Sequence, residues 1–335
     1  MKKYLFFIFW VGAVSCKSDT KEVIKNQSTG GIFGTSYSII YLAERSLDYQ
    51  QEIDSVFRVV NQSLSTYIPE SDISRINRGD STLQVDHMFK DVFELSRKIY
   101  RNTKGYFDPT VGTLVNAWGF GPGEEVAMDS TKVDSLLQYV GFDKVRISTQ
   151  RTVVKENVNI YFDFNAIAKG YAIDRVAVLM DNKGIQNYLI EIGGEIVAKG
   201  RNTIKDKPWT LGIDNPENEE ERELKLIINL KDRALASSGN YRKFRVDEQT
   251  GEKYVHTIDP ITGFTKNSST LGVTVLANDC ATADGYATAF MAMDLDTAKK
   301  IIESDSGLDA YIIYVDVNGA IREYMTDGFK KVVLR

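Results

Sequence analysis

Hydrophobic positions along the chain follow two periods, and these predict where helices and strands form. Ile53, Val56, Phe57 and Val60 recur at helical spacing and predict a helix over residues 48–64. A second amphipathic helix is expected over residues 88–102. Further helices are expected over 130–140, 166–180 and 296–304. Alternating or short apolar runs predict strands over 31–41, 158–162, 188–192, 195–199, 209–213, 225–230, 271–276 and 310–315.

The order of these elements indicates the fold class. Strands and helices do not alternate one to one, which favours an α+β fold with largely antiparallel sheets over a doubly wound parallel sheet. No internal repeat and no strong linker divides the chain after residue 30. We therefore expect one domain over residues 30–335.

The first 29 residues have the pattern of an export signal. Lys2 and Lys3 precede an apolar run over residues 4–14, which is too short to span a bilayer. Small residues then lead to Cys16, as in a bacterial lipobox. We expect a lipoprotein signal peptide over 1–15, acylation of Cys16 with palmitate or a similar chain, and a flexible tether over 16–29. The alternative is a plain signal peptide with Cys16 free, because Ala13 replaces the commoner leucine.

This prediction places the protein in the bacterial cell envelope, facing the periplasm and held on the membrane by lipid. Loss of the signal and use of Cys16 leave Cys280 as the remaining cysteine, so an internal disulfide is excluded. The net charge of −5 argues against nucleic acid as a partner. Only His87 and His256 are histidines, which argues against a zinc site. A phosphate ligand would have to be met by a local cation or by backbone amides.

The segment 279–291 carries the clearest candidate chemistry. It predicts a helix on which Asp284 and Thr288 lie one turn apart, on the same face, among small residues. A carboxylate and a hydroxyl in that arrangement could hold a metal ion close to a phosphate. The alternative is that Asp284 caps the helix while Thr288 packs on its own turn.

Five glycine-marked segments add to this pattern, and each also has a structural interpretation. Residues 105–112 with 118–121 could bind a planar ring, or form a turn beside a buried tryptophan. Residues 163–174 begin a helix and could bind an anion, or could contain an ordinary cap and a solvated Lys169. Residues 190–195 and 237–241 could approach a ligand or form hairpin turns. His256, in segment 256–263, could be a general base or a structural histidine.

Taken in order, these segments resemble the ApbE family of FAD:protein FMN transferases, many of which are exported lipoproteins. The resemblance runs from about Gly31 to the C-terminus. It is carried by residues 33–35, 65–67, 107–112, 118–121, 163–174, 192–194, 237–241, 256–263 and 284–288.

The resemblance implies a fold of the T-fold type, FAD as the bound donor and Mg²⁺ as the metal. It assigns the metal to side-chain oxygens of Asp284 and Thr288 and to the backbone carbonyl of Ala166. The residues implied to contact FAD are Phe33, Tyr67, Trp118, Gly119, Phe120, Asp163, Lys169 and Ile258.

The implied reaction moves the FMN part of FAD to a threonine or serine hydroxyl of an acceptor protein and releases AMP. Asp284 and Lys169 would assist catalysis, and His256 is the preferred base, with Asp259 as the alternative. The implied acceptors are flavoprotein subunits of membrane redox complexes of the NQR or RNF kind. Two other hypotheses stay open: an FAD pyrophosphatase that yields FMN and AMP, and a non-catalytic FAD-binding lipoprotein.

Overall fold

An eight-stranded antiparallel sheet forms the centre of the molecule. The computed structural model describes residues 22–215, 224–239, 244–246, 253–266 and 268–334. In spatial order the sheet contains β1 (Ile24–Ile32), β2 (Thr35–Ala43), β5 (Asn187–Ile192), β6 (Glu195–Lys199), β9 (Arg233–Gly239), β12 (Thr270–Ala277), β13 (Asp309–Val315) and β14 (Ile321–Met325). Every pair of neighbouring strands runs antiparallel. The predicted α+β class with antiparallel sheets is therefore confirmed.

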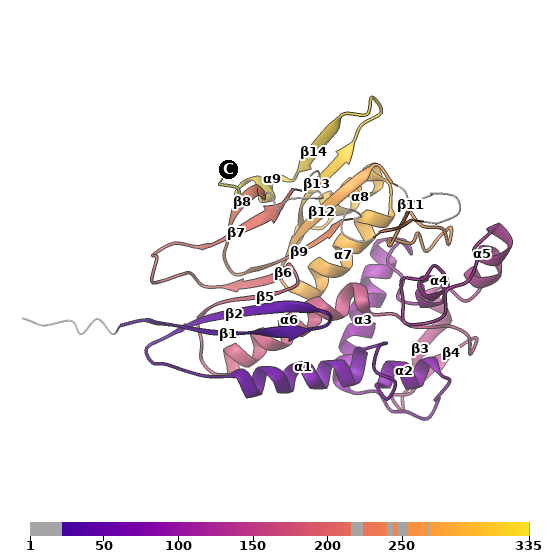
Figure 1. Ribbon diagram of the computed structural model, residues 1–335, viewed down its shortest axis with the longest axis horizontal. Coiled ribbons are helices and arrows are strands. Elements are labelled where there is room, and N and C mark those ends of the chain that lie inside the picture. The colour runs from indigo at the N-terminus through magenta and orange to yellow at the C-terminus, as the bar shows by residue number, and fades with distance from the viewer. Residues whose placement is uncertain (1–21, 216–223, 240–243, 247–252, 267, 335) are drawn as a thin grey trace, which may run out of the picture.

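Three two-stranded ribbons and a set of helices complete the described elements (Figure 1). The ribbons are β3 (Val145–Ile147) with β4 (Val153–Lys155), β7 (Trp209–Asp214) with β8 (Leu224–Leu230), and β10 (Phe244–Val246) with β11 (Lys253–Val255). The helices are α1 (Gln50–Leu64), α2 (Asp72–Asn77), α3 (His87–Asn102), α4 (Gly112–Ala117), α5 (Ser130–Leu137), the short η1 (Phe142–Lys144), α6 (Asn165–Asn182), α7 (Cys280–Ala292), α8 (Leu295–Ser304) and α9 (Asp327–Lys330).

The two faces of the sheet are covered differently. Helices α1 and α6 pack on β2 and β5, and Phe57, Val176 and Ile190 belong to the one buried cluster formed there. Helices α3 and α7 continue this helical layer over β9 and β12. On the opposite face, the β7–β8 ribbon buries Trp209 and Ile228 against the sheet. Because successive side chains of a strand point to opposite faces of the sheet, each central strand packs both against the helices and against the β7–β8 ribbon.

The start of the sheet corrects the predicted tether. Residues 24–29 belong to β1, and the predicted strand over 31–41 is instead the end of β1, a tight turn and β2. Phe33 and Gly34 form that turn with φ of 53° and 74°, as a two-residue hairpin requires. Asn26 is buried, and its side chain accepts the Leu47 amide hydrogen at 2.7 Å. Strand β1 contains the polar run Lys25–Thr29, so an apolar periodicity could not predict it.

The expected strand over 158–162 was wrong. This segment is a loop with one isolated bridge, between Val111 and Tyr161. The Asn77 side chain supplies the hydrogen bonds that a neighbouring strand would give: its Nδ2 donates to the Phe162 carbonyl at 2.9 Å, and its Oδ1 accepts the Phe162 amide hydrogen at 2.7 Å. Lys155 also donates to the Ile160 carbonyl at 2.9 Å. Side chains therefore fix this loop.

Two of the glycine-marked segments belong to the sheet. Gly193 and Gly194 form the predicted hairpin turn between β5 and β6, with φ of 60° and 103°. Residues 237–239 end strand β9, whereas residues 240 and 241 lie outside the described part of the chain. The predicted signal peptide and Cys16 also lie outside it. Within the described residues, no helix has both the length and the apolar character needed to cross a membrane.

Candidate active site

The candidate site lies where the start of α6 meets the start of α7. At the contact, a Cβ added to Gly170 would lie 2.4 Å from the Cys280 carbonyl oxygen and 2.8 Å from the Ala281 Cα. The helices can approach this closely only because residue 170 has no side chain. The Asp174 carboxylate holds them together, since its two oxygens accept the amide hydrogens of Cys280 and Ala281 at 2.8 Å each.

The two predicted metal-binding helices are brought together by a hydrogen bond from Gly170 to Asp284. The Gly170 amide donates to Asp284 Oδ2 at 3.0 Å. In a regular helix this amide would bond the carbonyl of Ala166, four residues earlier. Asp284 thus takes or shares that donor, which leaves acceptor capacity on the Ala166 carbonyl. Thr288 lies one turn beyond Asp284 in α7 and is half-buried, as the spacing predicts.

An ion pair with one buried and one partly exposed partner lies beside Asp284. Lys169 Nζ lies 2.6 Å from Glu195 Oε2, at the first residue of β6. Burial lowers the pKa of Lys169, but the negative charges of Glu195 and Asp284 outweigh this effect and raise it. Burial and the charge of Glu195 raise the pKa of Asp284, while Lys169 and the Gly170 amide oppose that shift. Two carboxylates therefore share one lysine, an arrangement that a bound cation would stabilise.

These donors fit a small, hard cation. The described residues hold no cluster of three or more histidine, cysteine, aspartate or glutamate side chains. An ion at this position would therefore need mixed oxygen donors: the Asp284 carboxylate, the Thr288 hydroxyl and the Ala166 carbonyl. Oxygen donors of these three kinds suit Mg²⁺ better than zinc or copper.

A second group of predicted residues lies around Asp163. Its Oδ1 accepts the Asn165 amide hydrogen at 2.7 Å, and its own amide donates to the Pro109 carbonyl at 2.7 Å. Burial raises the pKa of Asp163, and burial followed by the charge of Asp163 raises the pKa of Tyr67. Asn165 Nδ2 also lies 3.5 Å from Thr66 Oγ1, so the segments that carry Tyr67 and Asp163 are neighbours, and Tyr67 is 60% exposed. A ring exposed to this extent is available to a ligand.

Residues 108–112 pack against the loop that leads to Asp163, and hydrogen bonds hold them in place. Asp108 Oδ1 accepts hydrogen bonds from the Thr110 amide and hydroxyl at 2.8 and 2.6 Å, and Asp108 Oδ2 accepts the Phe142 amide hydrogen at 3.1 Å. Burial raises the pKa of Asp108 to about 6. A Cβ on Gly112 would lie 2.6 Å from Tyr161 Cδ1, so this loop packs tightly on the segment that leads to Asp163. The turn interpretation of residues 108–112 is favoured here.

A third group joins the tryptophan segment to the histidine segment. Trp118 and Ile258 are buried in one cluster, with Phe120 packed against it, and Trp118 Nε1 donates to the Gly263 carbonyl at 3.0 Å. Gly119, between the two aromatic residues, is exposed with φ of 78°. His256, half-buried, stands two residues before Ile258. Both segments predicted to contact FAD are therefore adjacent in space.

Phe33 approaches the helical layer from the β1–β2 turn. Its ring lies 5.8 Å from that of Phe57, edge to face, and remains partly exposed.

Cys280 is buried, and burial raises the pKa of its thiol well above the usual range. Cys280 is therefore a buried small residue and not a nucleophile, because a thiolate nucleophile needs the opposite shift.

Comparison with known proteins decides the family. The ApbE family model matches residues 33–312. The chain belongs to the ApbE family. The ApbE relatives include FAD:protein FMN transferases from Haemophilus influenzae, 33% identical over 95% of this chain and 93% of the relative, and from Vibrio cholerae, 34% identical over 94% of each.

Solved ApbE structures have the same fold. The flavin transferase ApbE from Vibrio cholerae superposes with a TM-score of 0.83 at 34% identity, covering 93% of this chain and all of that one. The apo form of the Pseudomonas stutzeri flavinyl transferase ApbE gives a TM-score of 0.80 at 27% identity, covering 94% and 98%. The family predicted from the sequence is confirmed, whereas the assignment of individual residues to FAD and metal stays a prediction.

Sequence reasoning missed Glu195 as a site residue. It was considered only as the residue after a glycine turn, although it is 4% exposed and pairs with Lys169. The available signal was an acidic residue on an apolar strand, at a position whose alternate neighbour Val197 faces the helices. Buried carboxylates need a partner, so this position predicted a cation nearby.

Proposed function

We propose that this protein transfers the FMN part of FAD to a threonine or serine hydroxyl of an acceptor protein and releases AMP. The name FAD:protein FMN transferase, which these curated relatives share, confirms the transferase class predicted from the sequence. The observation that carries the proposal is the buried pairing of Asp284 with the Gly170 amide beside the Lys169–Glu195 ion pair. This is a compact, charged site for a diphosphate, located within the matched family region.

The reaction is a displacement at phosphorus. The acceptor oxygen attacks the phosphorus nearer the riboflavin and forms a new P–O ester bond. The anhydride bond between that phosphorus and the bridging oxygen breaks, and AMP departs with the bridging oxygen. The hydroxyl proton passes to a base on the protein. No covalent enzyme intermediate is needed, so the residues act through positioning and charge.

The charged residues divide the work of holding the diphosphate. Asp284, Thr288 and the Ala166 carbonyl would hold Mg²⁺, which when bound offsets the charge of the diphosphate and of the departing AMP. Lys169 would add a second positive charge; its side chain is 28% exposed, so the ammonium can face a ligand while it pairs with Glu195. Phe33, Tyr67, Trp118, Gly119, Phe120, Asp163 and Ile258 would contact FAD.

We assign the base to His256. The alternative, Asp259, is occupied in its own turn: its Oδ1 accepts the Ile261 amide hydrogen at 2.9 Å, and its Oδ2 lies 3.5 Å from Lys266 Nζ. Asp259 is also 4% exposed. A carboxylate that organises a buried turn is poorly placed to collect a proton from an incoming protein, whereas His256 is half-buried.

The N-terminal sequence supports a proposal for the cellular setting. We propose that Cys16 is acylated after cleavage of residues 1–15 and that the enzyme faces the periplasm from a membrane of the cell envelope. Its acceptors would be flavoprotein subunits of membrane redox complexes of the NQR or RNF kind. Metabolic labelling with radioactive palmitate, with a Cys16→Ala variant as control, tests the anchor.

One assay separates the three functional hypotheses. Purified protein is mixed with FAD, Mg²⁺ and the flavin-free, threonine-bearing subunit of an NQR-like complex. Transfer gives a fluorescent acceptor band with one AMP per flavin bound. Free FMN with AMP would instead identify a pyrophosphatase, and unchanged FAD would identify a binding protein.

The metal assignment has its own control. Asp284→Ala should abolish transfer and also abolish the rise in melting temperature that Mg²⁺ gives the wild type. Asp294→Asn is the matched variant, because it alters an aspartate that caps α8 through the Thr297 amide. If Asp284→Ala kept full activity in chelator-treated buffer, the metal role of Asp284 would be wrong.

A further inference from the structure

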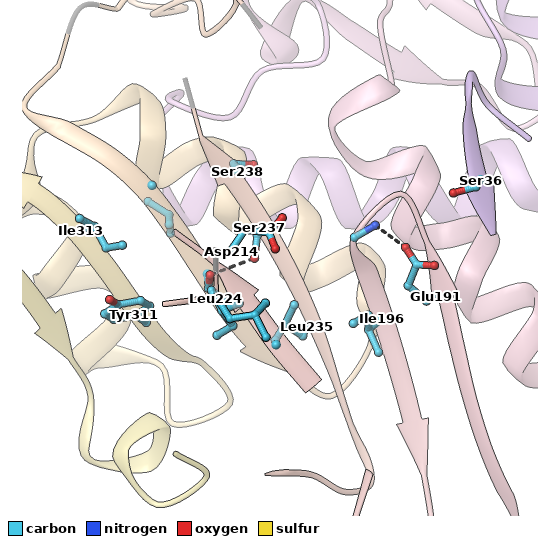
Figure 2. A pocket seen from close by; sticks show the side chains of 16 residues that line it. Ser36, Glu191, Ile196, Asp214, Leu224, Leu235, Ser237, Ser238, Tyr311 and Ile313 are labelled. Atoms are coloured by element: carbon cyan, nitrogen blue, oxygen red, sulfur yellow. Dashed lines mark hydrogen bonds between the residues drawn. The ribbon is translucent and has the colours of Figure 1, made fainter. Parts of the chain in front are cut away.

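The central sheet opens between β6 and β9. These strands pair from Ile196 with Leu235 to Ala198 with Arg233, and the pairing ends there. Strand β9 continues for four more residues, 236–239, paired on its other side with β12 as far as Gly239 with Gly272. Among the described residues, nothing pairs with the β6-facing edge of 236–239. Figure 2 shows β6 and β9 diverging above Leu235 and Ile196.

The open edge has room for another backbone. Residues 237–239 are two serines and a glycine, all half-buried, and Gly272 lies opposite Gly239 across the ladder. Glycines in a strand often mark a place where a second backbone approaches closely. An unpaired strand edge is a template for an added strand, because its outward amides and carbonyls need partners.

A cavity of about 430 Å³ lies under this opening, on the face of the sheet that carries β7 and β8. Its floor is apolar, formed by Ile196, Leu235 and Ile313. Its rim is polar and includes Ser36 and Ser237. The Ser237 hydroxyl lies 2.9 Å from Thr274 Oγ1. Glu191 points along the rim and accepts the Gly194 amide hydrogen at 2.7 Å (Figure 2). Side chains of moderate size could enter this space.

The opening is continuous with the candidate active site. Gly194, at its border, is followed directly by Glu195, which pairs with Lys169. Ala236, at the start of the open edge, packs in the cluster that contains Ala283 and Ala287 of α7, the neighbours of Asp284 and Thr288. The helix-facing side of the opening therefore leads to the site, and its other side leads to the cavity.

We propose that an extended segment of the acceptor protein docks here by pairing with the open edge of β9. This inference rests on the proposed transferase function, which requires a protein hydroxyl to reach the diphosphate. Four strand residues span about 13 Å, enough to hold a short segment in register. Side chains of the added strand alternate between faces, so its threonine turns toward Asp284 and Lys169 while its neighbours enter the cavity.

This docking mode gives the reaction its specificity for an extended segment. Main-chain pairing supplies affinity without reading sequence, and the cavity selects the residues on either side of the threonine. A hydroxyl within a helix or a folded sheet could not pair with β9. The enzyme therefore acts on loops or termini of its acceptor.

The closing experiment uses full-length protein, FAD, Mg²⁺ and the flavin-free subunit of an NQR-like complex. Ser237→Tyr places a ring over the cavity, and Ser237→Ala is the matched control that loses only the hydroxyl. We expect Ser237→Tyr to raise the KM for the acceptor at least about tenfold (~1.4 kcal/mol). The Kd for FAD, measured by flavin fluorescence, should stay within twofold in both variants.

A second measurement avoids any substitution. Hydrogen exchange on the wild type, with and without the acceptor subunit, should show new protection of amides in 236–239. An unchanged acceptor KM in a folded Ser237→Tyr variant, or protection that omits 236–239, overturns the docking proposal while transfer itself stands. If the wild type gives neither a flavin-labelled subunit nor AMP, the transferase function fails instead.

Discussion

Replacing Gly170 with alanine tests whether the crossing of α6 and α7 sets the geometry of the site. The new methyl would lie 2.4 Å from the Cys280 carbonyl oxygen and 2.7 Å from its carbonyl carbon. Both are backbone atoms, so the helices must separate by about 1 Å to reach ordinary contact. Overpacking of this kind costs roughly 1–3 kcal/mol, and the better helix propensity of alanine offsets about 0.5–1 kcal/mol. We expect a net loss of about 1–2 kcal/mol.

The same displacement should raise the activation free energy of flavin transfer by more than it lowers the free energy of unfolding. It moves Asp284 away from the Gly170 amide and from Lys169, and a shift of about 1 Å can cost on the order of 100-fold in rate. Thermal unfolding and the flavin-transfer assay measure the two effects. Gly285→Ala is the control, because its methyl clashes only with Ile99 Cδ1, at 2.6 Å, the end of a side chain that can rotate, and meets the Phe107 ring at an ordinary 3.5 Å. A Gly170→Ala variant with wild-type melting temperature and rate would refute the reasoning.

Three further predictions test other parts of the structure. Asn77→Ala removes both hydrogen bonds to the backbone of Phe162, the residue before Asp163. Because Asp163 is predicted to contact FAD, we expect the KM for FAD to rise by a larger factor than kcat falls. FAD titration and steady-state kinetics measure the two effects. A double-mutant cycle with Lys169→Met and Glu195→Gln, followed by denaturant unfolding, should give a coupling of about 1–3 kcal/mol, and zero coupling would contradict the pairing. Burial raises the pKa of Asp174 to about 7, above about 3.9 in the unfolded chain. The folded state therefore binds the extra proton, and stability falls as the pH rises from about 4 to 7. Asp174→Asn should flatten that slope in unfolding measured at pH 5 and 7.

Elements with a strong period were predicted well from the sequence. The helix expected over 88–102 is α3, His87–Asn102, because Phe89, Val92, Phe93 and Ile99 all face the core. The strands expected over 188–192 and 195–199 match β5 and β6 to within one residue. In these elements the apolar face and the local propensity agree, so the sequence alone is sufficient.

Elements stabilised by side-chain contacts from distant residues could not be predicted in this way. Strand β1 contains buried Asn26 and Ser28, and Asn26 bonds the segment around Leu47. Residues 158–162 look like a strand but receive their hydrogen bonds from Asn77, about eighty positions earlier. In both cases a polar group far along the chain decides the structure, and periodicity carries no information about it.

The site shows the same division. The spacing of Asp284 and Thr288 on one helix was visible, because a helix turn is a local property. The role of Glu195 was not, because Lys169 reaches it only once β6 lies across α6. Close packing at Gly170 is likewise a contact between helices more than a hundred residues apart. The amino-acid sequence shows which reactive side chains are present, and the folded structure shows which of them lie close together.

The position at which β1 begins also limits how far the enzyme can work from a membrane. If Cys16 carries lipid, eight residue steps separate it from Ile24, a reach of at most about 28 Å. Strand β1 then acts as a rigid spacer of nine residues, about 30 Å, that ends beside Phe33. If Phe33 also borders the flavin, as predicted, the flavin-transferring centre would stand no more than about 60 Å from the lipid surface. Acceptor threonines farther from the bilayer than this would escape modification.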